Sequence, residues 1–175
     1  MNFDYRNMVP EELDGSSRVW IYQAARLFSI SEALQIEEML NDFAASWTSH
    51  GTPVKGFASL FYGQFIVLMA DEKASMVSGC STDSSVRLIK QIETHFHVPM
   101  FDRQLLAFLV RGKVQLLPLS QLQHGASTGI IHPDTLYFNN TVLTKSDFEK
   151  NWIIPVSESW LSARIEFPDI ISRQS

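Results

Sequence analysis

The chain has 175 residues, of which 45% are hydrophobic, and its formal net charge is −5 at pH 7. This composition predicts a packed globular domain rather than a disordered chain, and an acidic balance without a block of like charges argues against a nucleic-acid-binding surface. A single cysteine excludes an internal disulfide and favours the reducing cytoplasm, and the sequence lacks the roughly 18 uninterrupted apolar residues of a membrane span.

The first elements expected along the chain are an N-terminal arm, a strand and a helix. Residues 1–17 hold several carboxylates and no apolar run, which argues against a secretory signal and predicts a flexible arm. Aromatic and β-branched residues at Val19–Tyr22 then predict a strand. Ser29 and Glu32 have the spacing of a capping box, and the apolar stripe that follows predicts a helix that Gly51 helps to end.

The middle of the chain alternates between strand and helix patterns. Residues 54–70 are rich in Phe, Leu, Ile and Val, and a glycine in their middle marks either a bulge or a turn between two shorter strands. We expect a further strand over 74–79 and a second helix over 84–96. Residues 105–117 alternate on both sides of an Arg-Gly-Lys turn, which predicts a hairpin.

The order of these elements predicts an α+β fold. The first strand of the hairpin would complete a ferredoxin-like β-α-β-β-α-β core, an antiparallel or mixed sheet whose two helices cover one face. Beyond Pro118 the pattern changes to short strands and helices, which predicts a C-terminal extension. We expect one globule over 18–167 and a frayed tail over 168–175; the alternative is a boundary near residue 100, where no Pro/Gly/Ser-rich linker stands.

Six short motifs are spread over most of the chain. They are Val19–Gln23, Phe65–Met69, Gly79–Ser85, Phe101–Arg103, Phe138–Asn140 and the pair Ser159-Trp160. With these motifs the chain resembles an uncharacterised bacterial protein family whose members are often labelled ABC transporter ATPase. Members of that family often carry a histidine after the last pair, whereas this chain has Leu161, so a role of that histidine does not transfer.

The ATPase label does not agree with the sequence. A Walker A loop has the pattern G-x-x-x-x-G-K-[ST], in which backbone amides hold the phosphates and a hydroxyl holds Mg²⁺. The only Gly-Lys pair is Gly112-Lys113; Val114 follows it, and Ala107 stands where the first glycine belongs. We therefore exclude an ATPase of the P-loop type, and the resemblance implies no other chemistry and no cofactor.

A second resemblance covers residues 107–152. In this region a strand, a Gly-Lys turn, a second strand, Pro118–Leu122 and Gly129–Leu136 follow one another. This order is similar to that of small GYF-like modules, which bind Pro-rich peptides through an aromatic surface. The resemblance implies a protein or peptide partner; the alternative is a generic hairpin, helix and strand.

The run Gly79–Ser85 is the first candidate for a ligand site. It contains the only cysteine, and its small polar side chains lie between a β-like segment and a helix, where backbone N–H groups and hydroxyls can hold an anion. The candidate ligand-binding residues are Cys80, Ser81, Thr82, Ser84 and Ser85, with Arg103 as a cation for the same anion. The alternatives are a nucleophilic Cys80 at a helix N-terminus and a structural helix cap.

A second group of candidates lies in the C-terminal part of the chain. One interpretation is a groove that binds a protein, a peptide or a second copy of the chain; the other is burial of the aromatic rings in the core. The residues of this group are Tyr137, Asn139, Asn140, Trp152 and Trp160.

The sequence predicts neither a metal site nor catalytic residues. The histidines form no H-x-x-x-H pattern, and C-x-x-C and the Rossmann glycine pattern are missing from the sequence. We therefore expect a soluble cytoplasmic binding or scaffolding protein, with a protein, peptide or homo-oligomeric partner and without nucleic acid or membrane. The alternative is an anion-binding protein or a thiol- or hydroxyl-dependent enzyme that uses Gly79–Ser85.

Overall fold

The computed structural model describes residues 4–71 and 79–168, and at residues 79–81 it describes the backbone alone. The chain divides into two compact units. We call them the N-terminal unit, Asn2–Asp102 with Asn140–Lys150, and the C-terminal unit, Arg103–Asn139 with Asn151–Ser175. The chain therefore leaves the N-terminal unit, returns to it for one short segment and leaves it again.

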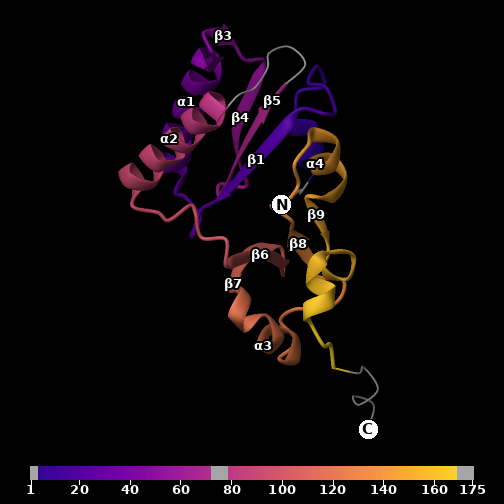
Figure 1. Ribbon diagram of the computed structural model, residues 1–175. Helices are drawn as coiled ribbons and strands as arrows, with labels where there is room; N and C mark the ends of the chain where they lie inside the picture. The colour runs from indigo at the N-terminus through magenta and orange to yellow at the C-terminus, as the bar shows by residue number, and fades with distance from the viewer. Residues whose placement is uncertain (1–3, 72–78, 169–175) are drawn as a thin grey trace. The chain divides into compact units, whose positions relative to one another are not determined.

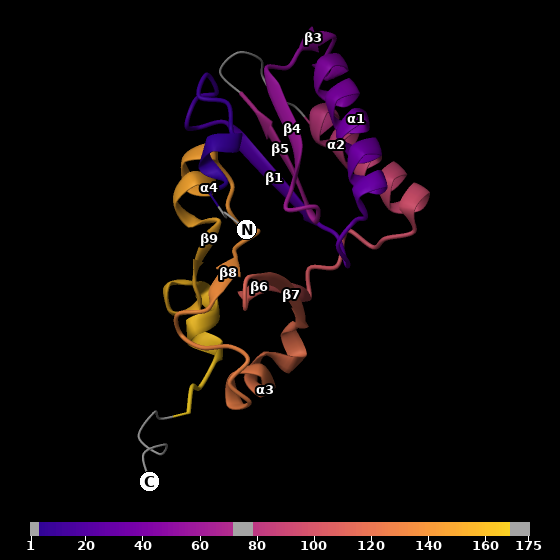
Figure 2. The ribbon, with the colours of Figure 1, turned by 180° about the vertical axis from the view of Figure 1, so that it is seen from behind.

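The N-terminal unit is a three-stranded antiparallel sheet with helices packed on it. Its elements are β1 (Arg18–Gln23), α1 (Ile30–Ser46), the short pair β2 (Thr48–Ser49) and β3 (Thr52–Pro53), β4 (Gly56–Phe61), β5 (Phe65–Ala70), α2 (Gly79–Phe96) and most of α4 (Lys145–Asn151). The strand order is β1-β5-β4. Figures 1 and 2 show α1 and α2 side by side on one face of this sheet.

Two expected features of the middle of the chain can be placed. The glycine between β4 and β5 marks a turn rather than a bulge, and Gly63 has a φ of 65° there. Residues 74–78 of the strand expected over 74–79 lie outside the described ranges, and Gly79 is the first residue of α2.

Helix α1 begins at the capping box that the sequence predicts. The Oγ of Ser29 accepts a hydrogen bond from the backbone N–H of Glu32 at 3.3 Å, and the Glu32 carboxylate accepts one from the N–H of Ser29 at 2.8 Å. Ile36 and Leu40 of the apolar stripe are fully buried in the core under the sheet. Burial contributes about 1.5–3 kcal/mol for each such side chain and the cap about 1 kcal/mol, so packing decides the position of this helix.

The Glu32 carboxylate predicts a pH dependence of stability. Two hydrogen bonds from Arg26, both 2.9 Å, and one from the Ser29 backbone lower the pKa of Glu32 from 4.5 to about 2. A carboxylate whose folded-state pKa is lowered stabilises the fold above its unfolded pKa, and this contribution is lost as the pH falls from 4.5 toward 2. Because the ion pair is exposed, solvent screening keeps the effect small.

Urea unfolding of Glu32→Gln at neutral and at acidic pH tests this expectation. The variant should be less stable than the wild type at neutral pH, and the difference should shrink below pH 4.5. Glu38→Gln, which removes an exposed carboxylate from the same helix, is the control. A difference between Glu32→Gln and the wild type that stays constant with pH would contradict the role of the ionised carboxylate.

Strand β5 is buried on both faces. All six of its residues are buried, and because successive side chains alternate, half of them point away from α1 and α2. On that second face the ring of Phe61 packs against the ring of Phe148 in α4, with 5.8 Å between their centroids. The ring of Tyr5 packs edge-on against Phe148 at 5.1 Å. The N-terminal residues and α4 therefore cover the second face of the sheet.

The N-terminal residues correct the flexible arm expected over 1–17. In the described part of that segment Tyr5, Val9 and Leu13 are buried. The hydroxyl of Tyr5 also donates a hydrogen bond to the backbone carbonyl oxygen of Phe148 at 3.1 Å. The segment is held in place because it removes apolar surface of the second sheet face from water.

The C-terminal unit is built on a four-stranded antiparallel sheet in the order β7-β6-β8-β9. Its elements are β6 (Leu105–Val110), β7 (Lys113–Pro118), α3 (Leu122–Ser127), β8 (Leu136–Phe138) and β9 (Ile153–Pro155), with the 3-10 helices η2 (Leu119–Gln121), η3 (Val156–Glu158) and η4 (Trp160–Arg164). Phe108 of β6 and Tyr137 of β8 share a core with Leu122 and Ala126 of α3. The strands and helices beyond Pro118 are short, as the sequence predicts.

The strand expected to complete a ferredoxin-like core pairs elsewhere. β6 bonds to β7 along one edge and to β8 along the other, so it takes no place in the β1-β5-β4 sheet. The turn Arg111-Gly112, with φ values of 52° and 73°, joins β6 directly to β7. A hairpin with so short a loop closes at little loss of chain entropy, which favours the local pairing. The mixed α+β class is confirmed, and the ferredoxin-like topology is not.

Candidate functional site

The start of α2 is helical where the sequence predicts a turn. α2 begins at Gly79, so Cys80 and Ser81 lie in its first turn, and their side chains lie outside what the structure describes. Ser85 is fully buried, and its Oγ donates a hydrogen bond to the carbonyl oxygen of Thr82 at 2.7 Å. Hydroxyls that bond to the preceding helical turn make a Ser/Thr run compatible with a helix. The Ser85 hydroxyl is thus already used within α2.

Ser84 faces a shallow groove between α1 and α2. The groove has a volume of about 450 Å³, and its α2 side includes Ser84, Arg87 and Gln91. Asp42 and Ser46 stand on the α1 side. The carboxylate of Asp42 repels an anion that Arg87 would attract, so the groove is poorly suited to anion binding.

The six residues expected to share one anion site are split between the two units. Thr82, Ser84 and Ser85 are on α2 in the N-terminal unit, whereas Arg103 is an exposed residue of the C-terminal unit. Their joint action on one anion, and the reactivity of Cys80, stay predictions.

The aromatic candidates of the C-terminal part have different surroundings. Trp152 is fully buried and packs edge-on against Phe138 at 5.7 Å. Tyr137 precedes Phe138 on β8 and therefore points to the opposite sheet face, where its ring lies 5.5 Å from Phe108 and 6.5 Å from Trp160. Of the three candidate rings, Trp160 is the partly exposed one, at 39%. Tyr137 and Trp152 are core residues that do not share one groove.

The polar groups of this set have local partners. The Nδ2 of Asn139 donates to the backbone carbonyl of Asn151 at 3.2 Å. The Nδ2 of Asn140 donates to the Oε1 of Gln23 at 2.9 Å within the N-terminal unit. Burial raises the pKa of the Tyr137 phenol, and a hydrogen bond with the indole of Trp160 partly opposes this rise. The phenol is therefore neutral near pH 7 and unsuited to act as a general base.

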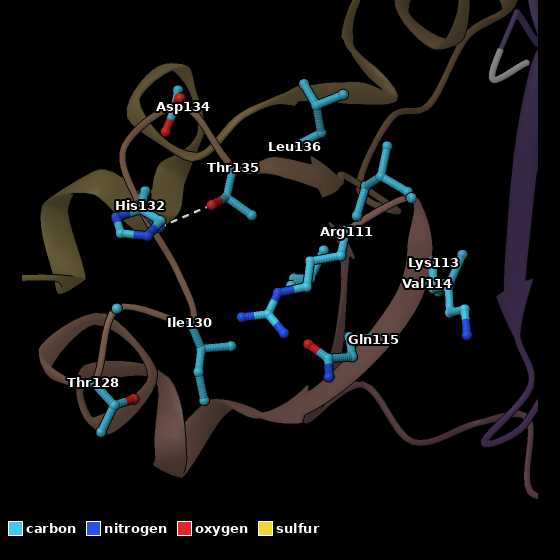
Figure 3. Close-up of a pocket in the computed structure, with 14 residues that line it drawn as sticks. Arg111, Lys113, Val114, Gln115, Thr128, Ile130, His132, Asp134, Thr135 and Leu136 are labelled. Carbon is cyan, nitrogen blue, oxygen red and sulfur yellow. Dashed lines mark hydrogen bonds between the residues drawn. The ribbon is translucent and has the colours of Figure 1, made fainter. Parts of the chain in front are cut away.

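A larger hollow opens at one end of the C-terminal unit. It has a volume of about 950 Å³ and lies between the tip of the β6–β7 hairpin and residues 128–136. Figure 3 shows the side chain of Arg111 extending from the hairpin tip into this space, toward the loop that carries Ile130 and His132. The amide of Gln115 points toward the same space, whereas Asp134 points away from it. The hollow is open to water, since Arg111 and Gln115 are exposed.

The hollow presents hydrogen-bond donors and positive charge. Arg111 and Lys113 line the hairpin side, and His132 lines the loop side. Within residues 4–71 and 79–168, Arg111 makes no hydrogen bond or ion pair, so its guanidinium donors are available to a ligand. The one carboxylate in the lining, Asp134, faces outward. A guanidinium with Gln and Thr groups nearby suits a carboxylate or a phosphate.

Two backbone turns shape the walls of this hollow. Arg111 and Gly112 both have positive φ, as a two-residue type I′ hairpin turn requires, although arginine is an unfavourable residue for that position. On the other wall Gly129, with a φ of 72°, ends α3: its N–H donates to the carbonyl of Ala126, and that of Ile130 to Gly125. This C-terminal cap turns the chain toward Ile130. The backbone N–H of His132 then donates to Thr135 Oγ1 at 2.8 Å, which fixes the loop (Figure 3).

Sequence reasoning did not identify this site. The sequence indicates a hairpin turn at Arg111 and Lys113, and no motif joins this turn to His132, because the two are far apart in the chain. The one available signal is arginine at a turn position where Asn, Asp or Gly is favoured.

Comparison of the chain with protein-family models, with curated proteins and with solved structures found no match. The two family resemblances therefore stay predictions. In the described ranges no group of three or more His, Cys, Asp or Glu side chains could hold a metal ion. None of the helices in those ranges combines the length and the hydropathy needed to cross a bilayer.

Proposed function

We propose that this protein is a binding protein and that the hollow of the C-terminal unit receives an anionic group of its partner. The observation that carries the proposal is the Arg111 guanidinium, which extends into a hollow of about 950 Å³ without a hydrogen-bond or ion-pair partner in the described residues. The start of α2 is the weaker candidate, because the Ser85 hydroxyl is bonded to Thr82.

The strength of the expected contact follows from its exposure. A hydrogen bond to a charged group contributes about 1.5–3 kcal/mol, and water around the open hollow keeps the contribution near the lower end. Two such bonds from Arg111 give about 3 kcal/mol, which corresponds to a Kd on the order of several millimolar for a small anion. Tighter binding needs further contacts from a larger partner.

Thermal unfolding in citrate tests this function. Citrate carries several carboxylates, and a ligand at concentration c that binds the folded state stabilises it by RT ln(1 + c/Kd), so the melting temperature rises with citrate concentration. We expect Arg111→Gln to lose the site-specific part of the citrate shift. Citrate also stabilises proteins by exclusion from their surface, so each variant is compared with wild type in citrate and in sodium chloride of equal ionic strength.

Arg103→Gln is the matched control, because it removes the same charge from an exposed position of the same unit outside the hollow. It should keep the citrate shift of the wild type. Equal citrate shifts in Arg111→Gln and in the wild type would reject the hollow as the site. If Arg103→Gln lost the citrate shift in melting temperature instead, the anion site would be at Arg103 and not in the hollow.

A further inference from the structure

The hollow adjoins an edge of the sheet that has hydrogen-bonding capacity left. β7 stands at the end of the strand order, and no strand of the described chain pairs with its outer side. Val110 and Lys113 close the hairpin as a hydrogen-bonded pair, so the backbone groups of β7 alternate from there between bonding to β6 and pointing outward. Val114 and Leu116 are the residues whose N–H and C=O groups point outward.

The two faces of β7 differ in chemistry. Gln115 stands opposite Phe108 in the register, and Lys113 opposite Val110, on the face that belongs to the core with α3. Val114 and Leu116 alternate with them and present apolar side chains to the other face. A strand added along this edge therefore meets cations and an amide on one face and aliphatic side chains on the other.

We propose that the hollow and the outer edge of β7 together bind an extended peptide segment in which acidic residues alternate with apolar ones. The segment would add to the sheet as a further strand, with backbone hydrogen bonds to Val114 and Leu116 and with its carboxylates toward Arg111 and Lys113. This inference rests on the proposed function and names the class of partner for the same site. Charge complementarity selects the acidic face of the segment, and strand pairing fixes its extended conformation.

The end of β7 sets the extent of the pairing. Pro118 has no N–H to donate, so the outward-pointing N–H groups of β7 that can pair with a peptide lie between Pro118 and the hairpin tip. Lys113 at the other end disfavours pairing with a basic segment, because like charges repel. The edge is therefore selective for an acidic strand.

Amide hydrogen exchange in the wild type tests strand addition directly. The probe is a hexapeptide of alternating glutamate and valine, acetylated and amidated at its ends. At saturation we expect exchange at Val114 and Leu116 to slow by at least about tenfold, while Lys113 and Gln115, already bonded to β6, change little. Peptide binding without this protection would overturn strand addition and leave the proposed anion site in place.

A pair of variants separates the edge from the hollow. Leu116→Pro removes an outward N–H that β6 does not use, so the hairpin is retained, and peptide affinity should fall by about tenfold or more while citrate binding persists. Arg103→Gln, at an exposed position outside both the hollow and β7, keeps the backbone ladder and should bind the peptide within about threefold of the wild type. Equal peptide affinity in Leu116→Pro and the wild type would contradict the inference.

A second peptide tests the charge. Replacing each glutamate of the hexapeptide by glutamine should weaken binding by about tenfold or more, and Arg111→Gln should then weaken the neutral peptide little further. Equal affinity for the two peptides would overturn the acidic preference. If neither citrate nor the acidic peptide bound to the wild type, the proposed function would fail together with the inference.

Discussion

Truncating Phe148 to alanine is expected to lower the free energy of unfolding of the N-terminal unit by about 3–5 kcal/mol. Phe148 is fully buried, and its ring packs edge-on against Phe61 at 5.8 Å and Tyr5 at 5.1 Å. Alanine would leave a cavity between the second face of the sheet and the residues that cover it. Urea unfolding, followed through the hydrogen exchange of the β5 amides, measures the loss.

Leu143→Ala is the control for this variant, because Leu143 lies in the same returning segment but is 69% exposed. We expect a change within about 0.5 kcal/mol for it. A loss of less than about 1 kcal/mol for Phe148→Ala would mean that α4 does not complete the core of the N-terminal unit.

The second large effect is expected in the C-terminal unit. Trp152 is fully buried, packs edge-on against Phe138 at 5.7 Å, and accepts a hydrogen bond from the N–H of Asn139 at its carbonyl oxygen, at 2.6 Å. Trp152→Ala should lower the free energy of unfolding of this unit by about 3–5 kcal/mol through the lost burial and the cavity. Denaturant unfolding followed by exchange of the β6 amides gives the value.

Trp160→Ala is the matched control among the tryptophans. Its ring is 39% exposed, and Arg164 lies over it at 5.2 Å from the centroid. Loss of that contact and of partial burial should cost about 1 kcal/mol. Comparable losses in the two variants would show that Trp152 does not have a core role distinct from that of Trp160.

The features that the sequence predicted correctly are local ones. The capping box at Ser29 and Glu32 and the apolar stripe of α1 depend on residues three or four apart, and the structure confirms both. The hairpin at Arg111-Gly112 likewise depends on residues that are adjacent in the sequence. Thr144 caps α4 through an equally local contact, since its Oγ1 accepts the N–H of Asp147 at 3.2 Å. Short-range physics decides each of these elements.

The features that the sequence did not predict depend on distant partners. The pairing of β6 with β8 joins Phe108 to Tyr137, and no local pattern distinguishes this from pairing with β1. The N-terminal arm looks polar because its apolar residues are scattered among carboxylates and form no run, yet Tyr5 is placed by contact with Phe148, far along the chain. The polar run at the start of α2 offered caps and turns as well as a helix, and helix formation prevailed from Gly79.

The candidate site was missed for the same reason. Its two walls are separate in sequence, and neither carries a motif: Arg111 is one arginine in a turn, and His132 is one histidine in a loop. What makes them a site is the end of α3, where Gly129 turns the chain to face the hairpin tip. That juxtaposition becomes visible only once the sheet and α3 are assembled.

Amide chemical-shift mapping with inorganic phosphate tests the central claim, anion binding in the hollow, most directly. Phosphate is added to the labelled wild-type protein at constant ionic strength and pH, and the shift of each amide signal is followed. We expect saturable shifts confined to residues 109–115 and 128–136, which line the hollow. Saturable shifts at residues 79–85 instead, or shifts that grow linearly over the whole chain, would contradict an anion site between the hairpin tip and the loop after α3.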